Sequence, residues 1–406
     1  MNLSKILYRF FSISGLFLGA LLIFFALAEL ASRLVLEKPQ SIEMQGLSQI
    51  ALPDPGGEKQ EAVSRGLAGY AIYEWSASKT GIRTKKNARV VIKRHTLSKQ
   101  DIELSTNALG YRYGDLRKKT GSDFRILFLG DSIIFADYAP ATETIPAHME
   151  SHLRSRDQTR QNIQVINAGG NGGELEGELA VLVETGLAVE PDVVLIGLYL
   201  NDANSSYFVK AAQYSKWIRW SYFLTHVLNR FQYLTVIMEN RERIQKQDDA
   251  MGEFISRNPV SDEASWEHSR EGFNNEIVNA FGDWGYAWTD EAWMKIESTA
   301  KLLEHVSEEH DIELIFVMFP VRQQVQSKIL RDEPQKKFQA VMKRLGIKHL
   351  DLLPLLRSKY QEDGVNVFYD HCHYRPEGNA FIADTISHFL IEASDRLQWL
   401  RTASTK

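Results

Sequence analysis

The sequence predicts a doubly wound α/β domain, in which helices cover both faces of a central parallel sheet. From Phe124 onward, short apolar runs alternate with helical stretches. The runs are bounded by Gly, Asp, Asn or Pro and are continuously apolar, as is typical of strands buried on both faces of a parallel sheet. In folds of this kind, functional groups gather at the carboxyl ends of the strands.

Five strands and five helices are expected in this part of the chain. The expected strands are 124–129, 163–166, 193–196, 314–319 and 347–350, and the expected helices are 145–154, 174–187, 290–309, 334–344 and 376–397. Upstream, the β-prone stretches 70–75, 88–92 and 102–105 predict a small strand-rich preface. Residues 39–68 contain several Pro and Gly without a sustained period, which predicts a linker.

Composition excludes several classes of protein. The chain has 406 residues, with 47 Lys and Arg against 52 Asp and Glu, so no basic excess exists to bind a nucleic acid. With 44% hydrophobic and 24% charged residues, wholesale disorder is not expected. The single cysteine, Cys372, excludes an intramolecular disulfide, a CxxC redox pair and a zinc cluster of cysteines.

The N-terminus carries an apolar segment that could cross a membrane. Residues 10–28 contain no charge, and Lys5 and Arg9 precede them, so the positive-inside rule places the N-terminus in the cytoplasm. Ala26-Leu27-Ala28 also resembles a signal-peptide cleavage site. The run is longer than a usual signal-peptide core, which favours an uncleaved single-pass anchor. Either alternative exports the body of the protein, to the periplasm if the cell is Gram-negative.

The chain is therefore divided into three parts. Residues 1–36 form a cytoplasmic tip and transmembrane anchor, 37–122 a linker and strand-rich preface, and 123–400 the α/β domain, which carries an insertion at 206–289. The insertion holds five of the eight tryptophans, and its segment 217–231 has the three- and four-residue apolar spacing of an amphipathic helix. That helix could pack on the core, or it could be a lid or a membrane-surface helix.

A candidate nucleophile follows the first expected strand of the sheet. Gly130-Asp131-Ser132 lies between this strand and a helical stretch, which places Ser132 at the carboxyl edge. A serine hydroxyl needs a base to accept its proton and donors for the oxyanion that forms. Gly130 allows a sharp turn there. Taken alone, the tripeptide is weak evidence, because such a sequence is more often a helix N-cap turn.

A candidate base follows the last strand of the sheet, in Asp370-His371-Cys372-His373. A spacing of three lets the Asp370 carboxylate accept Nδ1–H of His373, so that Nε2 faces Ser132. His371 is expected to point elsewhere, and Cys372 to be a packed, inert thiol. The alternative is a metal site using both histidines and the aspartate, but no further ligand set is evident at another strand end.

Two more turns could supply oxyanion donors. The glycine-rich turn 167–173 after the second strand leaves main-chain N–H groups open to a substrate oxygen, and it lacks the motifs of a nucleotide cradle. After the third strand comes Asn201-Asp202, and the Asn201 amide is a neutral donor that could reach the same oxyanion.

Taken together, these residues resemble the four ordered blocks of the SGNH (GDSL-like) hydrolases: Ser132 in GDS, a glycine of the second turn, Asn201 in Asn-Asp, and His373 in Asp-x-x-His. The resemblance covers about 124–204 and 314–390. It implies a flavodoxin-like three-layer sandwich, with Ser132 as nucleophile, His373 as base and Asp370 as its orienter.

The resemblance also implies the oxyanion donors: the Ser132 main-chain N–H, the Gly172 N–H and the Asn201 side chain. Gly172 is preferred to Gly170 because the family glycine usually lies five positions past the asparagine that ends the second strand, here Asn167. Two features depart from the family. Leu200 stands where many members carry glycine, and residues 206–289 are longer than in a minimal member.

Residues 107–112 look like a segment of membrane-anchored members of the family, either as a structural turn or through a contribution of Arg112 to the rim of the site. Trp266, Trp284, Tyr286, Trp288 and Trp293 could stack on sugar rings, or they could belong to the core.

The predicted activity is that of a serine esterase or deacylase acting outside the cytoplasm, through an acyl-enzyme, on O-acyl esters linked to carbohydrate or lipid. The alternatives are an O-acyltransferase that modifies a cell-surface polysaccharide, as in the alginate acetylation proteins that the chain resembles, and a catalytically silent carbohydrate-binding module. No cofactor, metal or nucleic acid is expected. The membrane is contacted through the N-terminal helix, and the sequence does not identify a protein partner.

Overall fold

The computed structural model describes residues 3–36, 38–39, 42–46, 61–65, 69–75, 82–157, 162–170, 174–203, 209–231 and 266–401. Its centre is a five-stranded parallel sheet in the spatial order β12-β11-β9-β7-β8. The strands are β7 (Asp123–Gly130), β8 (Asn162–Asn167), β9 (Val193–Leu198), β11 (Glu313–Met318) and β12 (Lys348–Asp351). All five predicted strands are confirmed. In chain order the arrangement is 2-1-3-4-5, that of flavodoxin-like folds.

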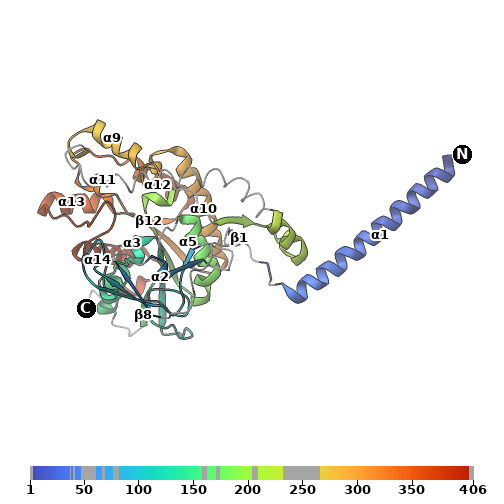
Figure 1. The fold of residues 1–406 in the computed structure, drawn as a ribbon, viewed down its shortest axis with the longest axis horizontal. Helices are drawn as coiled ribbons and strands as arrows, with labels where there is room; N and C mark the ends of the chain where they lie inside the picture. Colours follow the sequence, from blue (N-terminus) through green and yellow to red (C-terminus); the bar gives the residue numbers. More distant parts are fainter. Residues whose placement is uncertain are drawn as a thin grey trace.

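Two groups of helices flank the sheet (Figure 1). The first consists of α4 (Ile145–Arg156) and α14 (Pro376–Ala393), which pack on each other. The second consists of α5 (Leu175–Val181), α10 (Asp290–Glu309) and α12 (Glu333–Leu345), in which α10 contacts both of the others. The predicted three-layer α/β class is confirmed.

Two predicted helices end earlier than expected. The helix predicted over 174–187 ends as α5 at Val181 and continues as a π-helical turn, Leu182–Gly186. Gly186 lies against the sheet, where a Cβ would meet Leu127 Cδ2 at 2.8 Å. The helix predicted over 376–397 stops at Ala393. Further helices in the described part of this region are α3 (Ser132–Phe135), α6 (Lys216–Arg219), α9 (Arg270–Asn279), α11 (Arg322–Gln326), α13 (Leu353–Asp363) and α15 (Gln398–Arg401), and residues 222–231 are helical too.

The preface is a small sheet that packs beside the first strand-to-helix turn. Strand β2 (Glu61–Arg65) pairs parallel with β5 (Arg89–Lys93), which pairs antiparallel with β6 (Ile102–Ser105). Val90 and Ile92 of β5 and Ile102 and Leu104 of β6 belong to one buried cluster that includes Phe135 of α3. Of the predicted strand 70–75, only β3 (Tyr73–Trp75) is a strand. It pairs with β4 (Ile82–Thr84), whereas α2 (Gly69–Ile72) is helical.

The linker predicted over 39–68 contains two strands. Strand β2 lies in it, and so does β1 (Ile42–Gly46), which pairs antiparallel with β10 (Val209–Gln213). The partner of each strand lies far along the chain, so the Pro and Gly content of the local sequence gave no sign of the pairing. Residues 47–60 and 66–68 lie outside the described part of the chain.

Helix α1 (Leu3–Val35) leaves the compact body as a separate rod, with the N-terminus at its far end (Figure 1). Its residues Gly15–Val35 have a mean hydropathy of 2.1 and are long and apolar enough to cross a membrane, as a signal sequence also can be.

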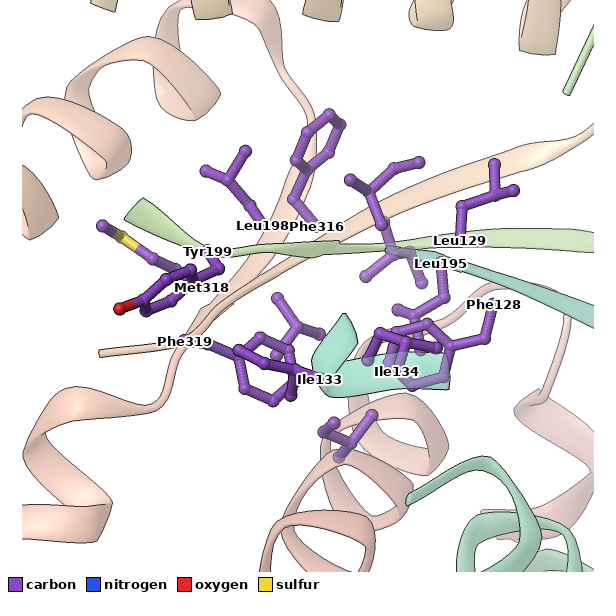
Figure 2. Packing of buried hydrophobic residues seen from close by; sticks show 14 of the residues in the cluster. Phe128, Leu129, Ile133, Ile134, Leu195, Leu198, Tyr199, Phe316, Met318 and Phe319 are labelled. Carbon is purple, nitrogen blue, oxygen red and sulfur yellow. The ribbon is translucent and has the colours of Figure 1, made fainter. Parts of the chain in front are cut away.

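The core of the α/β domain lies between the sheet and its helices. Every residue of β7 and of β9 is buried, as expected for strands covered on both faces. Figure 2 shows Ile133 and Ile134 of α3 in the same buried cluster as the side chains of the central strands. The turn after β7 is therefore fixed by the packing of Ile133 and Ile134 in the hydrophobic core.

Candidate active site

The nucleophile candidate lies in a short, tightly packed turn. Strand β7 ends at Gly130, and Asp131 caps α3 by accepting a hydrogen bond from the Ile133 N–H at 2.8 Å. A Cβ on Gly130 would overlap the Ile134 side chain, so the turn requires glycine. Ser132 therefore lies at the carboxyl end of β7. This strand is hydrogen-bonded to both β8 and β9, at the point where the strand order reverses and α/β sheets bind their ligands.

The structure brings Ser132, His373 and Asp370 together in one chain of hydrogen bonds. Ser132 Oγ lies 2.9 Å from His373 Nε2, and His373 Nδ1 lies 2.7 Å from Asp370 Oδ2. The other oxygen of Asp370 accepts the main-chain N–H groups of Cys372 at 2.9 Å and of His373 at 2.8 Å. The carboxylate thus holds both the loop and the imidazole, which leaves Nε2 to accept the serine proton.

The pairing of Asp370 with His373 shifts the pKa values of both groups. Burial opposes the ionisation of Asp370, but the charge and the hydrogen bonds of His373 outweigh it and hold the pKa of the carboxyl well below its usual range. Burial lowers the pKa of His373, but the adjacent Asp370 outweighs it, so that the pKa of His373 is raised. The pair favours the imidazolium, the form that follows proton transfer from Ser132.

Two further residues support this geometry: Tyr138, which the sequence did not point to, and Arg112, which it did. The ring of Tyr138, which is fully buried, meets the ring of His373 edge-on at 5.1 Å between centroids. Arg112 is buried and donates to the main-chain oxygens of Phe135 at 2.8 Å, of Ala136, and of Ala139 at 2.6 Å. The guanidinium of Arg112 thus stabilises the segment after α3, which confirms the structural role for this residue. The alternative prediction, that Arg112 contributes to the rim of the site, is wrong.

Two of the three predicted oxyanion donors lie in described residues. Ser132 begins α3, and Asn201 lies in the 3-10 turn Leu200–Ala203 that follows β9. The side-chain oxygen of Asn201 is buried and has no hydrogen-bond partner within the described ranges. Gly172 lies outside the described residues. The Gly170 N–H donates to Gly130 O at 2.9 Å and therefore holds the turn.

Three buried carboxyl groups lie near the carboxyl ends of the strands. Burial raises the pKa of Asp131, Glu178 and Asp202. The negative charge of Asp131 raises the pKa of the other two further, and that of Glu178 raises the pKa of Asp202. Asp202 accepts the Tyr199 N–H at 2.7 Å, whereas neither carboxyl oxygen of Glu178 has a partner in the part of the chain that the structure describes. Asp370 is the carboxylate that is hydrogen-bonded to His373, and its charge is the largest of those that raise the pKa of the imidazole.

A second histidine–aspartate pair lies on the same loop. His371 Nε2 lies 2.9 Å from Asp283 Oδ2, and the main-chain oxygen of His371 accepts the Arg322 N–H at 2.8 Å. Burial lowers the pKa of His371, but Asp283 outweighs it and the pKa is raised. Asp283 belongs to the predicted insertion 206–289 and was not predicted as a site residue, because nothing in its local sequence marks it.

Two groups of side chains in the described ranges lie close enough together to be considered as metal ligands. The first group is Asp370, His371 and Cys372. Asp370 is already paired with His373 and His371 with Asp283, and burial raises the pKa of the Cys372 thiol well above its usual range. The second group is His152, Asp384 and His388 on α4 and α14. There the Arg156 guanidinium donates to His388 Nε2 at 2.8 Å, which places a positive charge beside the group. Neither arrangement favours a cation.

The aromatic residues considered for sugar stacking lie mostly in the core. Trp266, Trp284, Tyr286 and Trp293 are buried, and Trp288 is half-buried. Trp284 and Trp288 pack edge to face with centroids 5.4 Å apart. Core packing is therefore confirmed for four of the five, and an exposed stacking platform formed by them is wrong.

Comparisons with known proteins gave distant structural likenesses. No family model matches the chain, and no curated protein matches its sequence. The acetyl xylan esterase AlAXEase superposes with a TM-score of 0.38 at 13% identity, over 66% of this chain and 100% of that one. A two-domain esterase (CEX) active on acetylated mannans superposes with a TM-score of 0.36 at 12% identity, over 66% of this chain and 49% of that one.

A lipolytic protein of the G-D-S-L family from Desulfitobacterium hafniense DCB-2 gives a TM-score of 0.34 at 12% identity, over 65% of this chain and 98% of that one. Likenesses at this level do not transfer an activity, so the function proposed next rests on the geometry of the site.

Proposed function

We propose that this protein is a serine esterase that cleaves O-acyl esters through an acyl-enzyme. The observation that carries the proposal is the continuous chain from Ser132 Oγ through His373 to Asp370, with contacts of 2.9 and 2.7 Å, at the switch point of the sheet. Nucleophile, base and orienter in this order are the parts that acyl transfer by serine needs.

In the proposed reaction, Ser132 Oγ attacks the ester carbonyl while His373 Nε2 accepts the hydroxyl proton. The oxyanion of the tetrahedral intermediate is assigned to the Ser132 and Gly172 main-chain N–H groups and the Asn201 amide. The intermediate collapses, the ester C–O bond breaks and the alcohol leaves with the proton from His373. Water then attacks the acyl-serine, His373 accepts its proton, and the acid leaves as Ser132 regains its hydrogen.

The proposed substrates are acyl esters of carbohydrates or lipids near the outer face of a membrane. The support for this location is α1, which has the length and hydropathy of a membrane span. In this proposal α1 is an uncleaved anchor, with its N-terminus in the cytoplasm and the catalytic domain outside it.

The test is covalent labelling by a fluorophosphonate probe, which reacts with activated serines. We expect the wild-type chain to be labelled and Ser132→Ala to remain unlabelled. Ser155→Ala, which removes an exposed serine hydroxyl on α4, is the matched control and should label like wild type. An unlabelled wild type, or equal labelling of Ser132→Ala, would show that Ser132 is not an activated nucleophile.

Product analysis with an acetylated substrate then distinguishes the fate of the acyl group. Hydrolysis releases free acid, whereas transfer to an added sugar leaves a new ester on that sugar. Release of acid alone is the outcome that the proposal predicts.

A further inference from the structure

The outer end of α1 is tied by polar contacts to a segment nearly two hundred residues later in the chain. The Glu29 carboxylate accepts Ser221 Oγ at 2.7 Å and the main-chain N–H groups of Tyr222 and Phe223 at 3.2 Å each. Residues 222–231 are helical, so Glu29 caps the beginning of that helix, where N–H groups need acceptors. Arg33, one turn further along α1, donates to the Trp220 main-chain oxygen at 2.6 Å.

Aromatic contacts extend this junction along α1. The Arg33 guanidinium lies over the rings of Trp220 and Tyr222, at 5.1 and 5.0 Å from their centroids. Phe223 meets Phe24 and Phe25 edge to face, with centroids 6.1 and 5.8 Å apart. Phe24 and Phe25 belong to the uncharged run of α1, so Phe223 lies at the depth where that run ends.

The same segment is also attached to the α/β domain. Strand β10 leads directly into α6 and pairs with β1, which follows α1. Arg219 Nη2 lies 3.7 Å from Glu309 Oε1 at the end of α10. Residues 216–231 therefore join the anchor to the body of the protein, and Figure 1 shows them on the side of the body from which α1 departs.

The burial of this segment is the reverse of that expected for a helix packed on a core. Thr225 and Asn229 are buried, whereas the side chains of Trp217, Trp220 and Phe231 are 88%, 70% and 65% exposed. Large aromatic side chains facing outward on a segment with exposed basic residues fit a membrane interface rather than water.

The length of α1 places these residues at a definite height. A helix of 33 residues spans about 50 Å, and the hydrocarbon core takes up about 30 Å. The charged residues Glu29 and Arg33 mark the level at which α1 leaves the apolar layer. Trp220 and Tyr222 contact Arg33 and so lie at that level, where tryptophan and tyrosine rings are favoured.

We propose that residues 216–231 form a membrane-interface segment that lies on the lipid headgroup layer where α1 emerges, with the side chains of Trp217 and Trp220 in the bilayer interface. This inference rests on the proposed uncleaved anchor. Its consequence is that the catalytic domain is held on the membrane at two adjacent places, which restricts its rotation about α1 and keeps the site at one height above the lipid.

The experiment measures lipid contact at single positions in the full chain reconstituted in nanodiscs of phosphatidylcholine and phosphatidylglycerol. Trp217→Cys carries a nitroxide label, and Met294→Cys, exposed at the beginning of α10, is the matched control. The native Cys372 is only 5% exposed, and a labelling reaction on the wild-type chain establishes its background. Collision rates of each label with oxygen, which enters lipid, and with a water-soluble nickel chelate are compared.

We expect the ratio of oxygen to nickel collisions to be several-fold higher at position 217 than at position 294. Equal, water-like ratios at both positions in a chain that retains α1 would overturn the interface segment and leave the anchor in place. A mature chain that begins at Glu29 would overturn the anchor and, with it, the interface segment. Labelling of Ser132 by the fluorophosphonate probe on the same samples reports on the esterase proposal separately.

Discussion

The loop 370–373 contains one histidine that faces a nucleophile and one that does not, and both are paired with an aspartate. His373 Nδ1 lies 2.7 Å from Asp370, and His371 Nε2 lies 2.9 Å from Asp283. Both imidazoles are largely buried, and the pKa of each is raised by its carboxylate. The difference lies in the second partner, because the other nitrogen of His373 lies 2.9 Å from Ser132 Oγ.

A buried histidine–aspartate pair is thus not in itself a sign of catalysis. Asp370 holds its histidine from within the same turn, and that turn faces the carboxyl end of β7. Asp283 comes from the segment before the 3-10 turn Gly285–Trp288 and fastens the loop from outside. We interpret the first pair as the general base with its orienter, and the second as a brace between the loop and the aromatic segment.

The largest effect should separate the two histidines. We expect His373→Gln to lower kcat by about 10³-fold or more, because Ser132 loses its base. His371→Gln should lower kcat by less than about tenfold, since it removes a contact that does not face Ser132. Initial rates on an aryl acetate, with enzyme concentration corrected by circular dichroism for folded protein, measure both. Equal losses in the two variants would contradict the separate roles.

The next prediction concerns how substitution of each aspartate changes the pH dependence of kcat/KM. The pKa of His373 is raised above its usual 6.5 by Asp370, and the base must be neutral, so kcat/KM of the wild type should fall as the pH drops through a midpoint above 6.5. Asp370→Asn removes the charge that raises this pKa. It should lower kcat by about 10³- to 10⁴-fold and move the midpoint to lower pH.

Asp283→Asn is the control for that profile, because Asp283 contacts His371 and not His373. It should leave the midpoint of kcat/KM unchanged within the error of the measurement. A shift of the same size in Asp283→Asn as in Asp370→Asn would show that the two pairs titrate as one unit.

The smallest effect is on stability and concerns the brace. Asp283→Ala leaves His371 buried without its carboxylate and should lower the free energy of unfolding by about 1–3 kcal/mol. The folded-state pKa of His371 is raised, so the stabilisation is present below pH 6.5 and is lost as the pH rises through the folded value. Urea unfolding at pH 5.5 and at pH 9 should show the larger loss at pH 5.5, and the reverse order would contradict the pairing.

Much of the fold could be predicted because its signals are local. Five continuous apolar runs predicted all five strands of the central sheet, and glycine, aspartate and asparagine marked where they end. Ser132 stands directly after β7, so its place at the carboxyl edge of the sheet could be read from the local sequence. Asp370 and His373 were expected directly after the last strand, and that expectation is wrong, because α13 (Leu353–Asp363) lies between β12 and their loop. The loop still precedes a helix, α14, as predicted.

What the sequence did not reveal depends on contacts between distant segments. Asp283 meets His371 across 88 positions, and the raised pKa of Glu178 follows from burial that no local pattern encodes. The composition of a segment also did not predict which of its tryptophans are exposed. Trp217 and Trp284 both belong to the tryptophan-rich segment 206–289, yet one is 88% exposed and the other is fully buried. Their difference arises from which part of the molecule each segment packs against.

The pairing of β1 with β10 has a consequence for the order of events during synthesis. Gly46 is made soon after α1, but its partner Val209 follows more than 160 residues later. At about 5–20 residues per second the first strand waits on the order of ten seconds for its partner. Throughout that interval, β1 lacks the strand with which it pairs in the folded protein. The β1–β10 pair, which lies between α1 and the α/β domain, is thus a high-contact-order element, and we expect it to form after the first three strands of the central sheet have been made.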